Sequence, residues 1–367
     1  MKTIVISAVN LVEGGTLTIL RDCLRYLSTL ASHGEYRVVA LVYKQELADF
    51  PHIEYIETQW PKQRWVNRLW YEYVSMQKIS EEIGDVYLWF SLHDTTPNVK
   101  AVRRAVYCHN PFPFYSFKWR EWFMTPKIVL FSLFSKYAYQ VNIHQNTKVI
   151  VQQQWIKDAF KSMFGLASSK IIVAVPDPPL ALELPEKSTN DGVYRFIYAG
   201  SPNSHKNFEC LTEAASILET RGVGPFEVRI TVKGEENAYA IWLKKNWGQV
   251  KSLHFAGFMN RATLFQHYAD ADALVFPSKV ETWGLPITEF AAFHKPMLLA
   301  DLPYAYETAS GCANVSFFPA DDAQALADQM EALIKGNTAA LKPVPIKALE
   351  APVSHSWANL FEQLLNN

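Results

Sequence analysis

The chain of 367 residues contains few cysteines and no long apolar run. Its four cysteines are far apart in the sequence and form no pair motif: Cys23, Cys108, Cys210 and Cys312. This pattern argues against a disulfide framework and a zinc site, and it fits a reducing compartment. Since no apolar run approaches the roughly 18 residues that cross a bilayer, we expect no membrane span.

The chain also lacks a strong net charge. Its formal net charge is −1 at pH 7, so no global field recruits nucleic acid, and we expect no nucleic-acid partner. Residues 1–8 have the pattern of a buried strand and not of a secretory signal peptide. We therefore expect a cytoplasmic protein.

What the chain has in abundance is apolar and aromatic residues. Hydrophobic residues make up 49% and charged residues 19% of the sequence, which favours a sizeable core and argues against disorder. The length exceeds that of a typical single domain and is typical of two domains.

Segments with strand and helix patterns alternate along the chain. Apolar residues at helical spacing predict a helix over 16–32, and a second helix is expected over 207–221. Strands are expected over 4–8, 36–43, 86–90, 105–108, 148–152, 194–199, 227–232 and 273–278. This alternation predicts parallel βαβ units, and so an α/β protein with doubly wound sheets.

Proline-rich and polar stretches at 175–179 and 186–191 interrupt this alternation and predict an interdomain linker. We place the domain boundaries at 1–178, 179–345 and 346–367, and the last segment contains a short amphipathic helix over 358–365.

Two glutamates eight positions apart, Glu281 and Glu289, frame the most informative segment. Between them, Gly284, Leu285 and Pro286 predict a turn into a helix over 286–293, because proline fits a first helical turn. Free N–H groups at such a start attract phosphate, and the carboxylates can accept hydrogen bonds from sugar hydroxyls. The alternative is an ordinary strand–loop–helix unit with a solvated Glu281 and a Glu289 that interacts with the helix dipole.

This segment resembles the Glu-x7-Glu signature of family 4 retaining glycosyltransferases, of the kind used in bacterial cell-surface polysaccharide assembly. The resemblance extends from Gly257-Phe258 through residues 267–278 to 295–300. It implies the GT-B fold, with two Rossmann-like domains facing an interdomain cleft. Residues 1–178 would bind the acceptor, residues 179–345 the nucleotide-sugar donor, and 346–367 would return to the N-terminal domain.

The same resemblance implies the site residues. Glu281 would contact the donor sugar and Glu289 the ribose, with the backbone of 284–286 against phosphate and sugar. His109, Lys206 and Glu281 form the predicted catalytic set. The predicted donor-binding residues are Gly14, Gly15, Gly200, Ser201, Lys206, Gly234, Ser278, Thr282, Gly284, Leu285, Pro286 and Glu289.

Lys206 has a chemical reason for its role, because a lysine near phosphates stabilises charge on a departing nucleoside diphosphate. The family usually has an arginine directly after the glycine at 200, but this chain has Ser201. His205 and Lys233 are candidates to replace the missing cation.

Two other constellations carry weaker hypotheses. His93 and Asp94 either orient the acceptor or cap a loop. Asp270 and Asp272 have the spacing of an Asp-x-Asp metal motif, but they end a helical pattern, so a structural role is expected. We predict no metal and no cofactor.

Residues 112–139 are dense in aromatic side chains, with interleaved Lys118, Arg120, Lys127 and Lys136. Such a segment either contacts a membrane peripherally, at the inner face, or packs in the core of a helical insert. Aromatic side chains that line a glycan site are a further alternative.

The sequence thus predicts a retaining, metal-independent glycosyltransferase that moves a sugar from a nucleotide-diphosphate sugar to a glycan or lipid-linked acceptor. A GT-B-like sugar-nucleotide epimerase, a non-catalytic nucleotide-sugar-binding subunit and a structural interaction protein stay open as alternatives. The base, the sugar and the acceptor also stay open.

Overall fold

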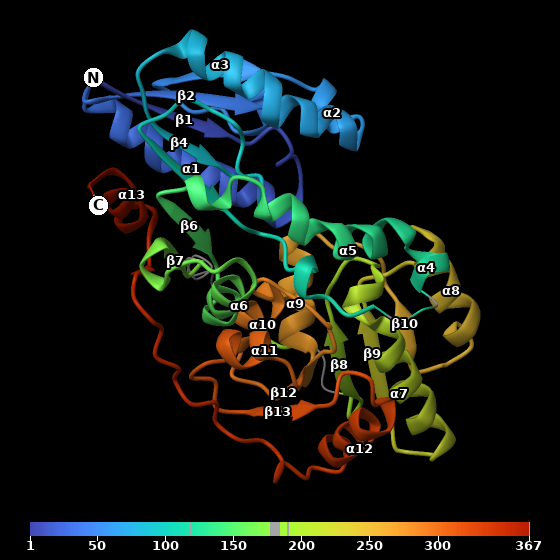
Figure 1. Ribbon diagram of the computed structural model, residues 1–367. Coiled ribbons are helices and arrows are strands. Elements are labelled where there is room, and N and C mark those ends of the chain that lie inside the picture. Colours follow the sequence, from blue (N-terminus) through green and yellow to red (C-terminus); the bar gives the residue numbers. More distant parts are fainter. Residues whose placement is uncertain (118, 120, 177–183, 189–190, 367) are drawn as a thin grey trace. The chain divides into compact units, whose positions relative to one another are not determined.

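The computed structural model describes residues 1–117, 119, 121–176, 184–188 and 191–366 (Figure 1). The chain groups into two compact units. The N-terminal unit comprises Met1–Asn110, Phe134–Asp177 and Leu349–Asn367, and the C-terminal unit comprises Pro111–Leu133 and Pro178–Ala348. Residues 111–133, which we assigned to the N-terminal domain, thus group with the C-terminal unit. The predicted boundary at 178–179 and linker residues 177–179, 189 and 190 lie outside the described residues.

The N-terminal unit contains an eight-stranded parallel sheet in the order β14-β7-β6-β5-β4-β1-β2-β3. Its strands are β1 (Lys2–Ser7), β2 (Tyr36–Val42), β3 (Ile53–Glu57), β4 (Val86–Ser91), β5 (Arg103–Tyr107), β6 (Lys148–Val151), β7 (Ile171–Ala174) and β14 (Val353–Ser354). The strand order reverses between β1 and β4, as in a doubly wound fold.

Alternation along β1 explains how helices cover both faces of this sheet. Ile4 and Ile6 point into a core shared with helices α1 (Gly14–Ser32) and α13 (Trp357–Asn366). Val5 points into the opposite core, where it meets Tyr71 and Met76. These two residues belong to a π-helical turn, Tyr71–Ser75, and to α3 (Met76–Ile83), which follow α2 (Trp65–Trp70). Helix α6 (Gln154–Phe164) precedes β7.

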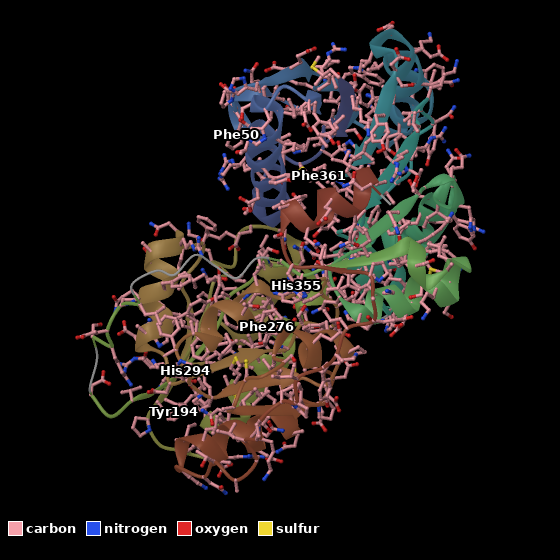
Figure 2. All side chains as sticks on the ribbon, turned by 90° about the vertical axis from the view of Figure 1, so that its left-hand side faces the viewer. Phe50, Tyr194, Phe276, His294, His355 and Phe361 are labelled. Atoms are coloured by element: carbon pink, nitrogen blue, oxygen red, sulfur yellow. The ribbon has the colours of Figure 1, made fainter. Side chains whose placement is uncertain are left out.

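The C-terminal helix α13 is part of the N-terminal core. Phe361, labelled in Figure 2, is fully buried and stacks on Tyr26 with ring centroids 5.4 Å apart. It also meets Phe90 edge-on at 5.8 Å. Trp357 packs against the same core.

The C-terminal unit contains a six-stranded parallel sheet in the order β10-β9-β8-β11-β12-β13. Its strands are β8 (Tyr194–Tyr198), β9 (Phe226–Ile230), β10 (Leu253–Phe255), β11 (Ala273–Phe276), β12 (Met297–Ala300) and β13 (Val315–Phe318). The connecting helices are α7 (Phe208–Thr220), α8 (Ala238–Trp247), α9 (Arg261–Asp270), α10 (Leu285–Ala291), α11 (Pro303–Thr308) and α12 (Ala323–Ile334). Strand residues on both faces of this sheet are buried, as Phe196, Ile197 and Val275 show. Burial on both faces explains why the strands are continuous apolar runs in the sequence.

The structure thus confirms the predicted α/β fold with two doubly wound sheets, although several bounds differ. The expected helix over 16–32 begins at Gly14, so Gly14 and Gly15 form its first turn. The expected helix over 286–293 spans Leu285–Ala291. Residues 111–133 include α4 (Glu121–Met124) and the start of α5 (Pro126–Gln140). In the part of the chain that the structure describes, no helix combines the length and the apolar character that crossing a bilayer requires.

Candidate active site

The candidate site of the C-terminal unit lies where its strand order reverses, between β8 and β11. In open α/β sheets, ligands bind at this switch point, beyond the carboxyl ends of the strands. Figure 2 labels Tyr194, at the start of β8, and Phe276, at the end of β11, so Phe276 marks the edge where the site lies. The loops after these two strands carry Gly200, Ser201, Lys206, Ser278 and Glu281.

Lys206 and Glu281 meet across this switch point. The Lys206 Nζ lies 2.5 Å from the Glu281 Oε1, and the two side chains are 18% and 12% exposed. Two predicted catalytic residues, 75 positions apart in sequence, therefore form a largely buried ion pair. A lysine held at this edge of the sheet is placed to compensate negative charge on a bound ligand.

Asn207 joins the two loops that carry this pair. Its backbone is in the left-handed region (φ 55°), and its amide donates to the carbonyls of Pro277 (2.9 Å) and Ala320 (2.7 Å). The Lys279 N–H donates to the His205 carbonyl at 2.8 Å. The sequence analysis did not predict that Asn207 connects these two loops. Asparagine adopts left-handed backbone more readily than most residues, so its presence in this loop could have indicated such a role.

Neither Ser201 nor His205 supplies the charge of the usual arginine. Ser201 is exposed, and its hydroxyl accepts from the Asn203 amide at 2.9 Å. Burial and the neighbouring Lys206 hold the pKa of His205 well below its usual range, so this imidazole is neutral near pH 7. The Lys233 Nζ lies 3.0 Å from a carboxylate oxygen of Glu235. Lys206 is therefore the cation that the structure places at the end of β8.

Two predicted glycines are held tightly. The Gly200 N–H donates to the Thr231 hydroxyl at 2.8 Å, and that hydroxyl donates back to the Gly200 carbonyl at 2.9 Å. Gly234 has φ +93°, and a Cβ there would lie 2.8 Å from the Lys244 Cβ. Both the backbone and the space at Gly234 therefore require glycine.

The predicted Glu-x7-Glu segment forms the turn into α10. Gly284 precedes the helix in left-handed backbone, with Leu285 and Pro286 as its first residues. Glu289 lies on α10, and the Tyr268 hydroxyl donates to its Oε2 at 3.4 Å. Burial raises the pKa of this carboxyl, although Arg261 opposes the shift.

Ser278 and Thr282 also belong to the predicted donor-binding residues. The Ser278 side chain is fully buried, and its hydroxyl points to the His205 and Val280 carbonyls, each at 3.3 Å. Thr282 is half-buried beside Glu281 in sequence. Ser278 thus joins the two loops, which is a structural reason for a serine at this position.

His109 and Asp94 form a second cluster, at the carboxyl ends of β5 and β4 in the N-terminal unit. The Asp94 Oδ1 accepts the His109 backbone N–H at 2.5 Å, and Asp94 has left-handed backbone (φ 69°). Burial raises the pKa of Asp94 to about 6 and lowers the pKa of His109 to about 4. Asp94 therefore caps the loop that presents His109, and the His109 imidazole is neutral near pH 7.

His93 is buried behind this loop. It is 1% exposed, and neither ring nitrogen has a hydrogen-bond partner among the residues that the structure describes. Burial holds its pKa well below the usual range. Of the two roles that the sequence left open for this pair, loop capping is the one that the Asp94 contacts support.

Gly14 and Gly15 follow β1, at the switch point of the N-terminal unit. Gly14 has φ +61°, and a Cβ there would meet no heavy atom within 4 Å. The backbone conformation therefore explains the glycine at position 14.

The aspartates of the Asp-x-Asp pattern serve the C-terminal fold. Asp270 accepts from the Ser188 N–H at 2.7 Å, and Asp272 accepts from the Arg195 N–H at 2.9 Å. Lys187 lies 2.5 Å from the other Asp272 oxygen. Among the described residues, no three His, Cys, Asp or Glu side chains gather as a metal site would require.

Residues 111–133 contact the loop that carries Lys206, which sequence reasoning did not anticipate. The Phe112 ring meets the His205 ring edge-on at 5.0 Å, and the Thr125 and Ser204 hydroxyls lie 2.9 Å apart. These contacts cover His205, and so they contribute to the burial that keeps it neutral. Lys118 and Arg120 lie outside the described residues.

Part of the chain matches a known protein family. Residues 182–345 match the family model described as Glycosyl transferases group 1. The matched region contains Lys206, Glu281 and Glu289, together with the whole six-stranded sheet. The chain thus contains a glycosyltransferase domain.

Similar proteins extend the comparison to the rest of the chain. O-antigen chain mannosyltransferase RfbU from Salmonella typhimurium is 21% identical over 243 residues, which is 65% of this chain and 62% of that protein. The match therefore spans less than two thirds of that relative.

Two solved structures are similar over nearly the whole chain. Sucrose-phosphate synthase from Thermosynechococcus elongatus superimposes with a TM-score of 0.63 at 14% identity, covering 93% of this chain and 91% of that one. Anabaena Alr3699/HepE in complex with UDP and glucose gives 0.62 at 15% identity, covering 93% and 92%. The fold is GT-B. At these identities, the likeness shows the fold alone.

Proposed function

We propose that the protein is a glycosyltransferase that transfers a sugar from a nucleotide-diphosphate sugar to a glycan or lipid-linked acceptor. The observation that carries this proposal is the ion pair of Lys206 with Glu281 at the switch point of a glycosyltransferase domain. The similarity to an O-antigen chain mannosyltransferase supports a place in cell-surface polysaccharide biosynthesis. The HepE complex with UDP and glucose supports a nucleotide-sugar donor.

Lys206 would stabilise the charge that builds on the departing nucleoside diphosphate. Glu281 lies 2.5 Å from this lysine. A bound donor would bring phosphate oxygens to Lys206 and sugar hydroxyls to Glu281. We propose that His109 contacts the reacting sugar as a neutral imidazole, because burial lowers its pKa to about 4.

We further propose that the reaction retains the anomeric configuration and needs neither a metal nor a cofactor. These two points rest on the resemblance of the Glu281 to Glu289 segment to family 4 enzymes. Proton NMR of the first-formed product reports the anomer, and a chelator should leave the rate unchanged. An inverted product or a chelator-sensitive rate would contradict them.

The first test is a thermal-shift screen across UDP-, GDP-, ADP- and dTDP-sugars. A donor at 100 times its Kd should raise the free energy of unfolding by about 2.7 kcal/mol. The stabilising donor is then used in transfer assays. Stabilisation by none of these nucleotide-sugars would count against the proposal.

Lys206→Ala should reduce kcat about 10²–10³-fold, the usual loss for one preorganised charge-stabilising group. The matched control is Lys245→Ala, because Lys245 is an exposed lysine on α8 of the same unit. Near-normal turnover of Lys206→Ala with an unshifted donor KM would remove Lys206 from the mechanism. Incubation with donor alone separates the alternatives: an epimerised nucleotide-sugar indicates an epimerase, and binding without any turnover indicates a binding subunit.

We also propose a peripheral membrane contact through residues 112–139. Helix α5 buries Val129, Ser132, Ser135 and Tyr139, whereas its other face is exposed at Leu130, Leu133, Phe134 and Tyr137. Trp119 and Phe123 are 77% and 71% exposed, and the only acid between 119 and 139, Glu121, is buried. Exposed aromatics with Lys127 and Lys136 fit the interface of an anionic membrane. A cytoplasmic enzyme at the inner face of the membrane would meet a lipid-linked acceptor there.

A further inference from the structure

The turn that carries Lys206 is held from several sides within the C-terminal unit. This 3-10 turn, Ser204–Lys206, is a single short turn, and the internal hydrogen bonds of such turns have poor geometry. The Tyr198 hydroxyl of β8 donates to the Lys206 carbonyl at 2.7 Å. The Lys279 N–H, in the loop after β11, donates to the His205 carbonyl at 2.8 Å. Two of the three residues of the turn are thus anchored to the sheet of this unit and its loops.

The other residue of the turn, Ser204, is held by the segment 111–133. Ser204 is 1% exposed, and its hydroxyl lies 2.9 Å from the Thr125 hydroxyl. The Thr125 hydroxyl donates to the Glu121 carbonyl, four residues earlier, at 3.3 Å, so its oxygen can accept from Ser204. Thr125 therefore gives a buried hydroxyl of the turn a hydrogen-bond partner.

The local structure around Thr125 fixes this partner in place. Thr125 lies between α4 and Pro126, the first residue of α5, and its N–H donates to the Glu121 carbonyl at 2.8 Å. The Glu121 side chain is buried, and its Oε2 accepts from the Tyr115 hydroxyl at 2.6 Å. The segment thus presents the Thr125 hydroxyl from a backbone that is itself held by buried contacts.

The position of this turn decides where the Lys206 ammonium group lies, because a lysine reaches its ligand on a flexible four-carbon stem. Misplacing a catalytic group by about 1 Å can lower the rate about 10²-fold. The segment 111–133 lies outside residues 182–345, the region that matches the family model. Support for the turn therefore comes from a part of the chain that begins just after His109 in sequence.

We propose that Thr125 and Ser204 are positioning residues for Lys206. Their hydrogen bond holds the turn so that the Lys206 ammonium group meets the departing diphosphate. The inference rests on the proposed function and deepens it. The segment that follows His109, the proposed sugar contact, would also orient the proposed leaving-group lysine.

The test is steady-state sugar transfer by the full chain. Thr125→Val removes the acceptor, so the buried Ser204 hydroxyl loses this bond and the turn should shift. We expect kcat to fall about tenfold, less than for Lys206→Ala, with a donor KM within about twofold of the wild type. Thr125→Ser keeps the hydroxyl and should keep the wild-type kcat. Ser132→Ala is the matched control and should also keep it, because the Ser132 hydroxyl donates to the Val129 carbonyl within α5 at 3.2 Å.

A double-variant cycle separates positioning of Lys206 from general support of the fold. In the Lys206→Ala background, Thr125→Val should lower kcat by less than about twofold, because residues that act through one another have non-additive effects. A further loss of about tenfold there would show that Thr125 acts independently of Lys206, and it would overturn the inference. A wild-type kcat in Thr125→Val, or a kcat in Thr125→Ser as low as in Thr125→Val, would overturn it too. If Thr125→Val does not fold, Ser204→Ala removes the other half of the bond and is held to the same outcomes.

Hydrogen exchange without donor separates this inference from the proposed function. The N–H groups of Lys206 and Asn207 donate to the carbonyls of Asn203 (2.9 Å) and Ser204 (3.0 Å). They should exchange about tenfold faster in Thr125→Val, because loss of one hydrogen bond makes local opening easier. If exchange is faster but the wild type transfers no sugar, the role of Thr125 in holding the turn stands and the proposed function fails. Unchanged exchange would overturn the inference whether or not the wild type transfers sugar.

Discussion

Single residues in this protein owe their chemistry to neighbours that lie far away in sequence. Lys206 and Glu281 are 75 positions apart and still meet at 2.5 Å. His205, next to Lys206, is instead neutral, because burial lowers its pKa. His205 is therefore not a cation near pH 7, and Lys206 carries the predicted leaving-group role.

Asp94 supplies a pH-dependent prediction at this scale. Burial raises its pKa from 3.8 to about 6, so between those values the folded protein binds more protons at Asp94 than the unfolded chain does. This group's contribution to the free energy of unfolding is therefore full below pH 3.8 and is lost as pH rises through 6. The loss amounts to about 3 kcal/mol.

Asp94→Asn should remove this dependence. The free energy of urea unfolding of the wild type minus that of the variant should fall by about 2 kcal/mol from pH 4 to 7. A difference that does not change with pH would mean that this carboxyl titrates normally.

Gly234 and Gly14 give a matched comparison of backbone strain and space. Both have positive φ, but a Cβ would overlap Lys244 only at Gly234. Gly234→Ala should cost about 2–5 kcal/mol, from left-handed backbone plus overpacking. Gly14→Ala should cost about 1–2 kcal/mol, from backbone alone. Chemical denaturation measures both, and equal costs would show that Lys244 moves aside freely.

At the scale of elements, α13 shows how the last residues of the chain stabilise a unit that the first residues begin. Phe361 is fully buried against Tyr26 of α1 and Phe90 of β4. The Tyr87 hydroxyl also donates to the Leu365 carbonyl at 2.7 Å. The helix is therefore part of the N-terminal core and not a loose extension.

Phe361→Ala should lower the free energy of unfolding of the N-terminal unit by about 3–5 kcal/mol, the usual cost of truncating a buried phenylalanine. Glu362→Gln, one residue further on the exposed side of α13, should change it by less than about 0.5 kcal/mol. Urea unfolding followed by tryptophan fluorescence checks both. A small effect of Phe361→Ala would show that α13 contributes little to this core.

At the scale of the whole molecule, each unit has its own parallel sheet and its own switch point. The donor-site residues from Gly200 to Glu289 all belong to the C-terminal unit. Binding of a nucleotide-sugar should therefore stabilise that unit more than the other. The stabilisation of each unit can be measured on the intact chain.

In calorimetry, the stabilising nucleotide-sugar should raise the unfolding temperature of the C-terminal unit. At 100 times its Kd, it should add about 2.7 kcal/mol to the free energy of unfolding of that unit. The transition of the N-terminal unit, which Phe361→Ala identifies by lowering it, should move less. A larger shift of the N-terminal transition would place the main donor contacts there instead.

The sequence by itself determined the fold class and the positions of the candidate residues. Alternating strand and helix patterns are local, and residues such as Lys206 and Glu281 follow strands in sequence, so their place at one sheet edge follows from parallel pairing. Sequence spacing also sufficed to recognise the turn at Gly284, because glycine and proline act on the backbone locally.

Only the tertiary structure decided which of these residues are charged, paired or covered. The neutral state of His205, the capping role of Asp94 and the clamp by Asn207 depend on burial and on contacts between distant segments. The same holds for residues 111–133, which pack on the Lys206 loop although they follow an N-terminal strand. Such contacts leave no periodic signal, because the hydrophobic pattern of a helix shows that one face is buried but not what buries it.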